Sequence, residues 1–214
     1  AVFRGARRVL YSEPAFNREL LGEPFVVDRY LRPLHAELCA QYAPIDEEYF
    51  DFVRFQENLL SRVRELSEAD PIERCNLLYS NSVLEHIPPD ELLVVLRRLR
   101  SLCTADATFI HVVDFSDHWK GDGPFDAIYR SDPPADRSKR AINLLRPPEI
   151  SKHIREAGFR VEMHPYRSYQ GDLGCLADHW KDFDEESLRM KVAFFVGEPE
   201  AVSGQSSAAV PSVP

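Results

Sequence analysis

Hydrophobic residues recur along the chain with two different periods, which predict alternating strands and helices. Short apolar runs predict strands over residues 8–12, 50–55, 76–80, 107–115, 159–164 and 191–196. Apolar residues at helical spacing predict helices over residues 31–42, 90–102 and 145–159. Strands that alternate with helices are typical of an α/β domain with a mainly parallel sheet.

Local signals predict where some of these elements begin and end. Asp90 follows Pro88 and Pro89, where the N-cap of a helix is expected. Gly158 is expected to close the helix over residues 145–159. From Glu198 onward the chain is rich in Ala, Ser, Val and Pro, which predicts a disordered tail over residues 198–214.

Composition narrows the class of protein. A length of 214 residues with 44% hydrophobic content suits one globular domain with a sizeable core. The formal charge of −9 argues against a nucleic-acid partner, because an acidic chain repels phosphate backbones. The sequence has no apolar stretch of about 20 residues and no secretory signal pattern, so we expect a soluble, cytoplasmic protein without a membrane partner.

The spacing of the cysteines and the lack of a nucleophile motif argue against several kinds of site. The four cysteines are far apart and form no CxxC pair, so neither a structural zinc site nor a disulfide framework is expected. The sequence contains no GxSxG elbow, which argues against a hydrolase of that type.

Residues 75–102 form a predicted strand, a polar turn and a helix in succession. Ligands of open α/β sheets bind outside the carboxyl ends of strands. A site is therefore expected around the polar residues of this turn, which are Ser80, Asn81, Ser82, Glu85 and His86. The alternative is that Ser80 to Ser82 only turn and cap the chain.

A metal cluster of His111, Asp114, Asp117 and His118 is a competing hypothesis, since imidazole and carboxylate groups suit zinc or iron. On one strand, however, residues 111 and 114 point to opposite faces. We therefore predict no metal ligands.

The segment 120–140 interrupts the alternation of strands and helices. Its residues Phe125, Tyr129 and Arg130 are predicted to contact a substrate, and the alternative is that the segment is only a solvated loop.

The run Tyr79–Ile87, YSNSVLEHI, resembles the fourth-strand motif of class I S-adenosylmethionine-dependent methyltransferases, of the type 11 kind. The resemblance covers about residues 5–197. It continues through the strand FIHVVDF, the run Asp117-His118-Trp119, the stretch Ile142–Arg146 and the sequence Glu156-Ala157-Gly158-Phe159.

This resemblance implies a fold, a cofactor and site residues. The implied fold is a Rossmann-like, doubly wound three-layer α/β sandwich, whose last strand, residues 191–196, is antiparallel. The implied cofactor is S-adenosylmethionine, and the implied acceptor is a small or glycan-like molecule. Glu13 would accept hydrogen bonds from the ribose, and Glu57 and Asn58 would lie near the adenine. Ser80, Asn81 and Ser82 would line the methionine end, and the candidate bases are His86, Asp114 and His118.

The sequence also departs from the family pattern. Asn76 replaces the usual aspartate before the fourth strand, and residues 103–106 replace the usual Pro-Gly-Gly turn. A glycine-rich loop after a first strand is missing, so we expect that strand to lie upstream of Ala1. A second hypothesis follows, in which the chain is a non-catalytic, methyltransferase-like partner or regulatory domain without cofactor binding.

Overall fold

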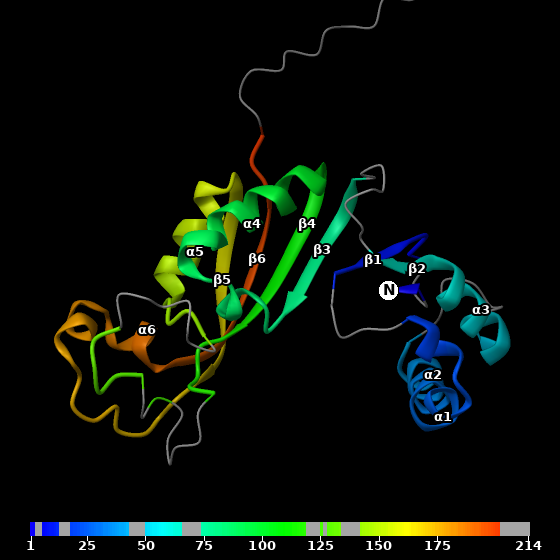
Figure 1. Cartoon of the computed structure of the whole chain (residues 1–214), viewed down its shortest axis with the longest axis horizontal. Helices are drawn as coiled ribbons and strands as arrows, with labels where there is room; N and C mark the ends of the chain where they lie inside the picture. The colour runs from blue at the N-terminus through cyan, green and yellow to red at the C-terminus, as the bar shows by residue number, and fades with distance from the viewer. Residues whose placement is uncertain are drawn as a thin grey trace, which may run out of the picture. The chain divides into compact units, whose positions relative to one another are not determined.

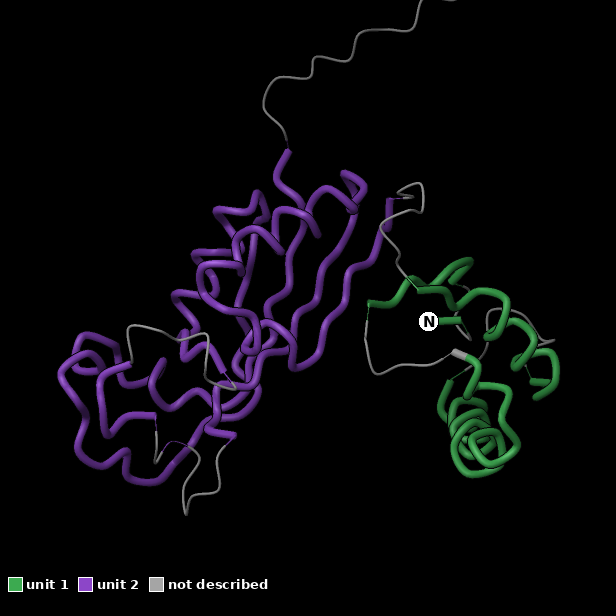
Figure 2. Tube along the Cα trace, in the orientation of Figure 1, with its two compact units in different colours: residues 1–71 green, residues 72–214 purple. Residues whose placement is uncertain are grey.

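The computed structural model describes residues 1–2, 6–12, 18–42, 50–65, 74–118, 125, 128–133 and 142–201. The chain divides into two compact units, unit 1 over Ala1–Pro71 and unit 2 over Ile72–Pro214 (Figure 2). A single methyltransferase domain over residues 1–197 stays a prediction.

Unit 1 is mostly helical and contains one short pair of strands. Its strands β1 (Val9–Tyr11) and β2 (Val63–Glu65) pair in parallel. Its helices are the 3-10 helix η2 (Arg18–Gly22), α1 (Pro24–Val26), the π-helix η3 (Val27–Leu31), α2 (Arg32–Gln41) and α3 (Phe52–Arg62). The strand predicted over residues 8–12 and the helix predicted over residues 31–42 are confirmed.

The strand predicted over residues 50–55 is wrong, because this segment begins helix α3. The Asp51 side chain caps the helix by accepting a hydrogen bond of 2.9 Å from the backbone N–H of Arg54. Phe52 and Phe55 are three residues apart and lie on one face of the helix, where Phe55 is buried. The spacing of the aromatic residues therefore reflects a helical period rather than strand alternation.

Unit 2 is built on a four-stranded sheet with the order β3–β4–β6–β5 (Figure 1). The strands are β3 (Cys75–Asn81), β4 (Cys103–Asp114), β5 (Phe159–Ser168) and β6 (Met190–Pro199). Strands β3 and β4 are parallel, whereas β6 is antiparallel to both β4 and β5. Three strands thus run in one direction and only the last runs against them. The predicted α/β class, with a mainly parallel sheet and an antiparallel last strand, is confirmed.

The helices of unit 2 follow the predicted pattern with small shifts at their ends. They are the 3-10 helices η5 (Leu84–His86) and η6 (Asp178–Asp182), and the α-helices α4 (Pro89–Leu102), α5 (Pro147–Glu156) and α6 (Glu185–Arg189). Helix α4 begins at Pro89, so Asp90 lies in the first turn of the helix instead of at the N-cap. Its negative charge still interacts favourably with the helix dipole there. Gly158 has a φ of 89°, which lets the chain leave α5 for β5.

The end of β6 differs from the prediction. Strand β6 continues to Pro199, so Glu198, the predicted first residue of a disordered tail, belongs to the sheet. The rest of that predicted tail from residue 202 lies outside the described residues. None of the helices in the described ranges combines the length and apolarity that a membrane crossing needs.

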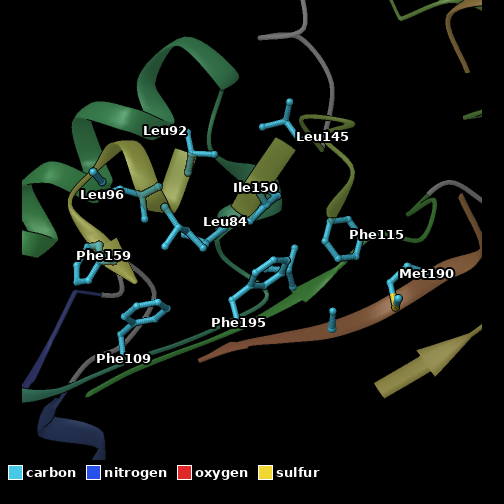
Figure 3. Close-up of a cluster of buried hydrophobic side chains, with 14 of the residues drawn as sticks. Leu84, Leu92, Leu96, Phe109, Phe115, Leu145, Ile150, Phe159, Met190 and Phe195 are labelled. Atoms are coloured by element: carbon cyan, nitrogen blue, oxygen red, sulfur yellow. The ribbon is translucent and has the colours of Figure 1, made fainter. Parts of the chain in front are cut away.

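The main core of unit 2 lies between the sheet and the helices α4 and α5, which cover one face of it (Figures 1 and 3). Leu92 and Leu96 of α4 and Ile150 of α5 are fully buried, as is Phe109 of β4. Burial of each such side chain contributes about 1.5–3 kcal/mol. This packing fixes β3, β4 and the start of α4 relative to one another, and so fixes the edge of the sheet where the predicted site lies.

A second buried cluster joins residues that are far apart in the sequence: Phe125, Ile128, Tyr129, Ile142, Leu144, Trp180 and Leu188. Phe125 and Tyr129, which the sequence predicted to contact a substrate, are 3% and 1% exposed and belong to this cluster. The Tyr129 hydroxyl donates to the backbone oxygen of Leu188, and burial raises the pKa of Tyr129 to about 12. The predicted substrate contacts of Phe125 and Tyr129 are therefore wrong, and only Arg130 of that group is exposed.

Candidate functional site

The candidate site lies where the parallel strands β3 and β4 end. After β3 the chain reverses at Ser82, whose φ of 53° is left-handed and whose N–H donates to the backbone oxygen of Val112 at 2.9 Å. The 3-10 helix η5 follows directly and carries Glu85 and His86. The local sequence thus places these two side chains at the carboxyl end of the sheet, as predicted from the strand–turn–helix pattern.

Asn143 holds this turn in place from a distant part of the chain. Its side-chain amide donates to the backbone oxygens of Leu84 at 2.7 Å and Ile87 at 2.8 Å. Its backbone N–H donates to the backbone oxygen of Glu85 at 2.6 Å. Its side-chain oxygen accepts a hydrogen bond of 3.0 Å from the backbone N–H of Leu145. Asn143 is 3% exposed, so these bonds form out of contact with water. The turn that carries Glu85 and His86 is therefore rigidly positioned.

The three candidate bases come together at this edge. The rings of His86 and His118 lie 5.1 Å apart between centroids, with an interplanar angle of 36°. Nε2 of His118 lies 4.0 Å from Oδ2 of Asp114, and Oδ1 of Asp114 accepts a 2.8 Å hydrogen bond from Ser116 N–H. The structure thus gathers residues that are up to 32 positions apart in the sequence, while their catalytic role stays a prediction.

Glu85 is buried beside them, which the sequence did not indicate. Its side chain is 3% exposed, and Oε1 accepts a 3.2 Å hydrogen bond from Asp114 N–H. Its other oxygen, Oε2, has no hydrogen-bond partner within the described part of the chain. Burial raises the pKa of Glu85 because the charged carboxylate loses solvation. The sequence indicated Glu85 only as a polar residue of the turn next to His86, and not as a buried one.

His111 lies on the helix-covered face of β4 and is 1% exposed. Its Nδ1 and the Ser80 hydroxyl are hydrogen-bonded at 2.7 Å, and its ring lies 5.2 Å from that of Phe109. Burial lowers the pKa of His111 to about 4. A metal cluster that joins His111 to Asp114 is not formed, because the two residues point to opposite faces of the strand.

The buried His111 predicts a pH dependence of stability. The unfolded chain takes up a proton near the ordinary pKa of 6.5, whereas the folded chain takes it up only near pH 4. The contribution of His111 to the free energy of unfolding is therefore fully present above pH 6.5. It is lost as the pH falls toward 4, which lowers the free energy of unfolding by up to about 3 kcal/mol. Urea unfolding of the wild type and of His111→Met between pH 7.5 and 4 measures it. The difference between the two proteins in unfolding free energy should change over this window, and two parallel curves would contradict the assignment.

The residues predicted for the adenosine end of the cofactor belong to unit 1. Glu13 lies outside the described residues. Glu57 and Asn58 lie inside helix α3 and not at the end of a strand, so the reason for assigning them to the adenine is wrong. Asn58 donates through its side chain to the backbone oxygen of Arg54 at 2.9 Å, and Glu57 pairs with the Arg54 side chain at 3.5 Å.

The residues predicted for the methionine end lie at the end of β3. The Ser80 hydroxyl is engaged with His111, whereas Asn81 and Ser82 are exposed. An exposed amide and hydroxyl beside a buried carboxylate suit the polar amino-acid part of S-adenosylmethionine. The assignment of Asn81 and Ser82 to the methionine end of this cofactor stays a prediction.

Comparison with known proteins gives structural neighbours. Neither the family models nor the curated proteins compared with the sequence contain a match. The CcbJ methyltransferase from Streptomyces caelestis is 16% identical with a TM-score of 0.42, and the match covers 72% of each chain. An S-adenosylmethionine-dependent methyltransferase from Clostridium acetobutylicum is 9% identical with a TM-score of 0.41, covering 87% of this chain and 94% of the other.

In other similar structures, the match covers only part of the neighbour's chain. An O-methyltransferase family protein from Burkholderia thailandensis is 16% identical with a TM-score of 0.39, covering 72% of this chain and 42% of the other. The chain spans 39% to 60% of the length of five further solved structures. Because these TM-scores are below 0.5, the functional proposal rests on this chain's own residues.

Arg146 is a further buried polar residue, and it binds the backbone next to Asp114. Its guanidinium donates to the backbone oxygens of Phe115 at 3.0 Å, Ser187 at 3.1 Å and Met190 at 2.8 Å. It also lies 5.0 Å from the ring centroid of Phe115, and burial lowers the pKa of Arg146. Sequence reasoning noted the stretch that contains Arg146 but gave no sign that an arginine there is 1% exposed.

Proposed function

We propose that this chain is an S-adenosylmethionine-dependent methyltransferase that acts on a small or glycan-like acceptor. The carrying observation is that His86, Asp114 and His118 converge where β3 and β4 end, the edge of the sheet at which the exposed Asn81 and Ser82 also lie. A cofactor-binding turn and a set of proton acceptors thus share one edge of a mainly parallel sheet. The resemblance of residues 79–87 to the methyltransferase motif supports the same function.

The residues have separate tasks in this proposal. S-adenosylmethionine, when bound, supplies a methyl group on a positively charged sulfur. Asn81 and Ser82 hold its methionine end. One of His86, Asp114 and His118 takes the proton of the acceptor as the new bond to carbon forms, and the other two orient the acceptor. The net charge of −9 supports a small acceptor over a nucleic acid.

Cofactor binding tests the proposal. Calorimetric titration of the full chain with S-adenosylhomocysteine should give a saturable signal, and Asn81→Leu should weaken binding by about tenfold or more, since one or two hydrogen bonds to the ligand are lost. Asn76→Leu is the matched control, because Asn76 is an exposed asparagine at the other end of the same strand. The Asn76→Leu variant should bind S-adenosylhomocysteine with the affinity of the wild type.

Two results would contradict the proposal. One is the absence of any binding of S-adenosylhomocysteine to the folded wild-type chain, which would favour the non-catalytic partner domain. The other is an equal loss of affinity in Asn81→Leu and Asn76→Leu, since this would separate binding from the carboxyl end of β3.

A further inference from the structure

The carboxyl ends of β3 and β4 bring two imidazoles and a carboxylate close together. One ligand atom from each of Glu85, His86 and His118 lies within 4.8 Å of the other two. Ligand atoms bound to one metal ion lie about 3 to 3.5 Å apart, because each sits about 2.1 Å from the ion. Small rotations of His86 and His118, both exposed at the rim, are enough to close that difference.

The state of Glu85 is an independent sign of a missing cation. Its carboxylate is 3% exposed, and Oε2 has no hydrogen-bond partner among the residues that the structure describes. A buried carboxylate oxygen without a partner is costly unless a proton or a cation satisfies it. In the described ranges, no lysine or arginine forms an ion pair with Glu85.

Asp114 adds a second negative charge at the same place. Its backbone N–H donates to Glu85 Oε1, and its carboxylate lies 4.0 Å from Nε2 of His118. This distance is too long for a hydrogen bond, so Asp114 contributes negative charge near His118 rather than a fixed orientation of its ring. Ser116 fixes Asp114 in turn through its backbone N–H.

We propose that Glu85, His86 and His118 bind one divalent first-row transition-metal ion. Two imidazole nitrogens with one carboxylate favour ions such as Mn²⁺, Fe²⁺, Co²⁺ or Zn²⁺, whereas Mg²⁺ and Ca²⁺ prefer all-oxygen sites. The prediction of no metal ligands, made from the sequence, considered His111, Asp114, Asp117 and His118 and did not consider this set.

The ion would also define the acceptor, a step that rests on the proposed function. Three protein ligands leave coordination positions open toward the exposed side of His86 and His118. An oxygen of the acceptor binds there, so the acceptor carries a hydroxyl group. Metal binding lowers the pKa of that hydroxyl, and its proton passes to the Asp114 carboxylate as the oxygen bonds to the methyl carbon and the carbon–sulfur bond breaks.

Cobalt titration of the full chain tests the metal site. Visible absorption of Co²⁺ should report one ion per chain, and Glu85→Gln and His118→Asn should each weaken binding by about 100-fold or more. His164→Asn is the matched control, because His164 is an exposed histidine beside a carboxylate, Glu162, 3.8 Å away. Its affinity should match that of the wild type.

Thermal unfolding without metal separates lost binding from lost folding. Glu85→Gln removes a buried unpaired charge, so it should unfold at or above the wild-type temperature. Wild-type affinity in Glu85→Gln, or equal losses in His118→Asn and His164→Asn, would overturn the metal site.

Acetohydroxamate, a small oxygen chelator, tests the open positions. It should shift the visible bands of the cobalt-loaded chain, and unchanged bands would overturn the hydroxyl acceptor. Binding of S-adenosylhomocysteine in EDTA is measured separately, so that failure of the proposed function and failure of the metal site give different results.

Discussion

Arg146→Met should destabilise unit 2 by about 3–5 kcal/mol, because several buried backbone oxygens lose their hydrogen-bond donor. The guanidinium satisfies the backbone oxygens of Phe115, Ser187 and Met190, and methionine has no donor for any of them. Each buried oxygen left without a donor costs about 1–3 kcal/mol, while the apolar volume is largely kept. Urea unfolding followed by tryptophan fluorescence measures the loss, because both tryptophans, Trp119 and Trp180, belong to unit 2.

Two further variants separate charge, geometry and position. Arg146→Lys keeps the charge but not the planar fork of donors, so it should lose an intermediate amount of stability. Arg160→Met is the matched control, since the Arg160 side chain is 67% exposed on β5 and pairs with Glu198 at the surface. It should stay within about 0.5 kcal/mol of the wild type. A loss below about 1 kcal/mol in Arg146→Met would show that the backbone oxygens find other donors.

Asn143→Ala should cost about 2–4 kcal/mol and should also weaken the proposed metal site. The change removes the donor for the backbone oxygens of Leu84 and Ile87 and the acceptor for Leu145 N–H. The turn between them carries Glu85 and His86, so its release lets two of the three proposed ligands move. Urea unfolding measures the first effect, and cobalt titration in the absence of urea measures the second.

Asn143→Asp sharpens this result because it changes one atom. The new carboxylate still accepts from Leu145 N–H, but it places an oxygen against the oxygens of Leu84 and Ile87 in place of a donor. It should therefore destabilise at least as much as Asn143→Ala at neutral pH. Asn76→Ala, at an exposed position of β3, should have no effect beyond about 0.5 kcal/mol. Equal stabilities of the wild type and Asn143→Asp would refute the role of the amide.

The fold class and the place of the site could be predicted because their signals are local. The pattern of residues 75–102 is a buried strand, a polar turn and an amphipathic helix, and each part follows from neighbours a few positions away. Residues at the carboxyl ends of parallel strands share one edge of the sheet, and the candidates His86 and Asp114 both lie at that edge. The antiparallel last strand came from the family resemblance, and the pairing of β6 confirms it.

The errors also have a physical cause. Phe52 and Phe55 fit strand alternation in isolation, but the Asp51 cap and burial on one helix face decide for α3. Phe125 and Tyr129 look like substrate contacts in a polar loop, yet Trp180 and Leu188 from more than 50 residues away bury them.

The sequence by itself determined the α/β succession of elements, the polar turn after β3 and the candidates His86, Asp114 and His118. Only the tertiary structure decided that Glu85 is buried with an oxygen that has no partner among the described residues, that Asn143 fixes the turn and that Arg146 binds the backbone oxygens of Phe115, Ser187 and Met190. Period and capping depend on residues within one or two turns of each other. Burial and hydrogen-bond satisfaction depend on partners 31 to 59 positions away, which a local pattern does not specify.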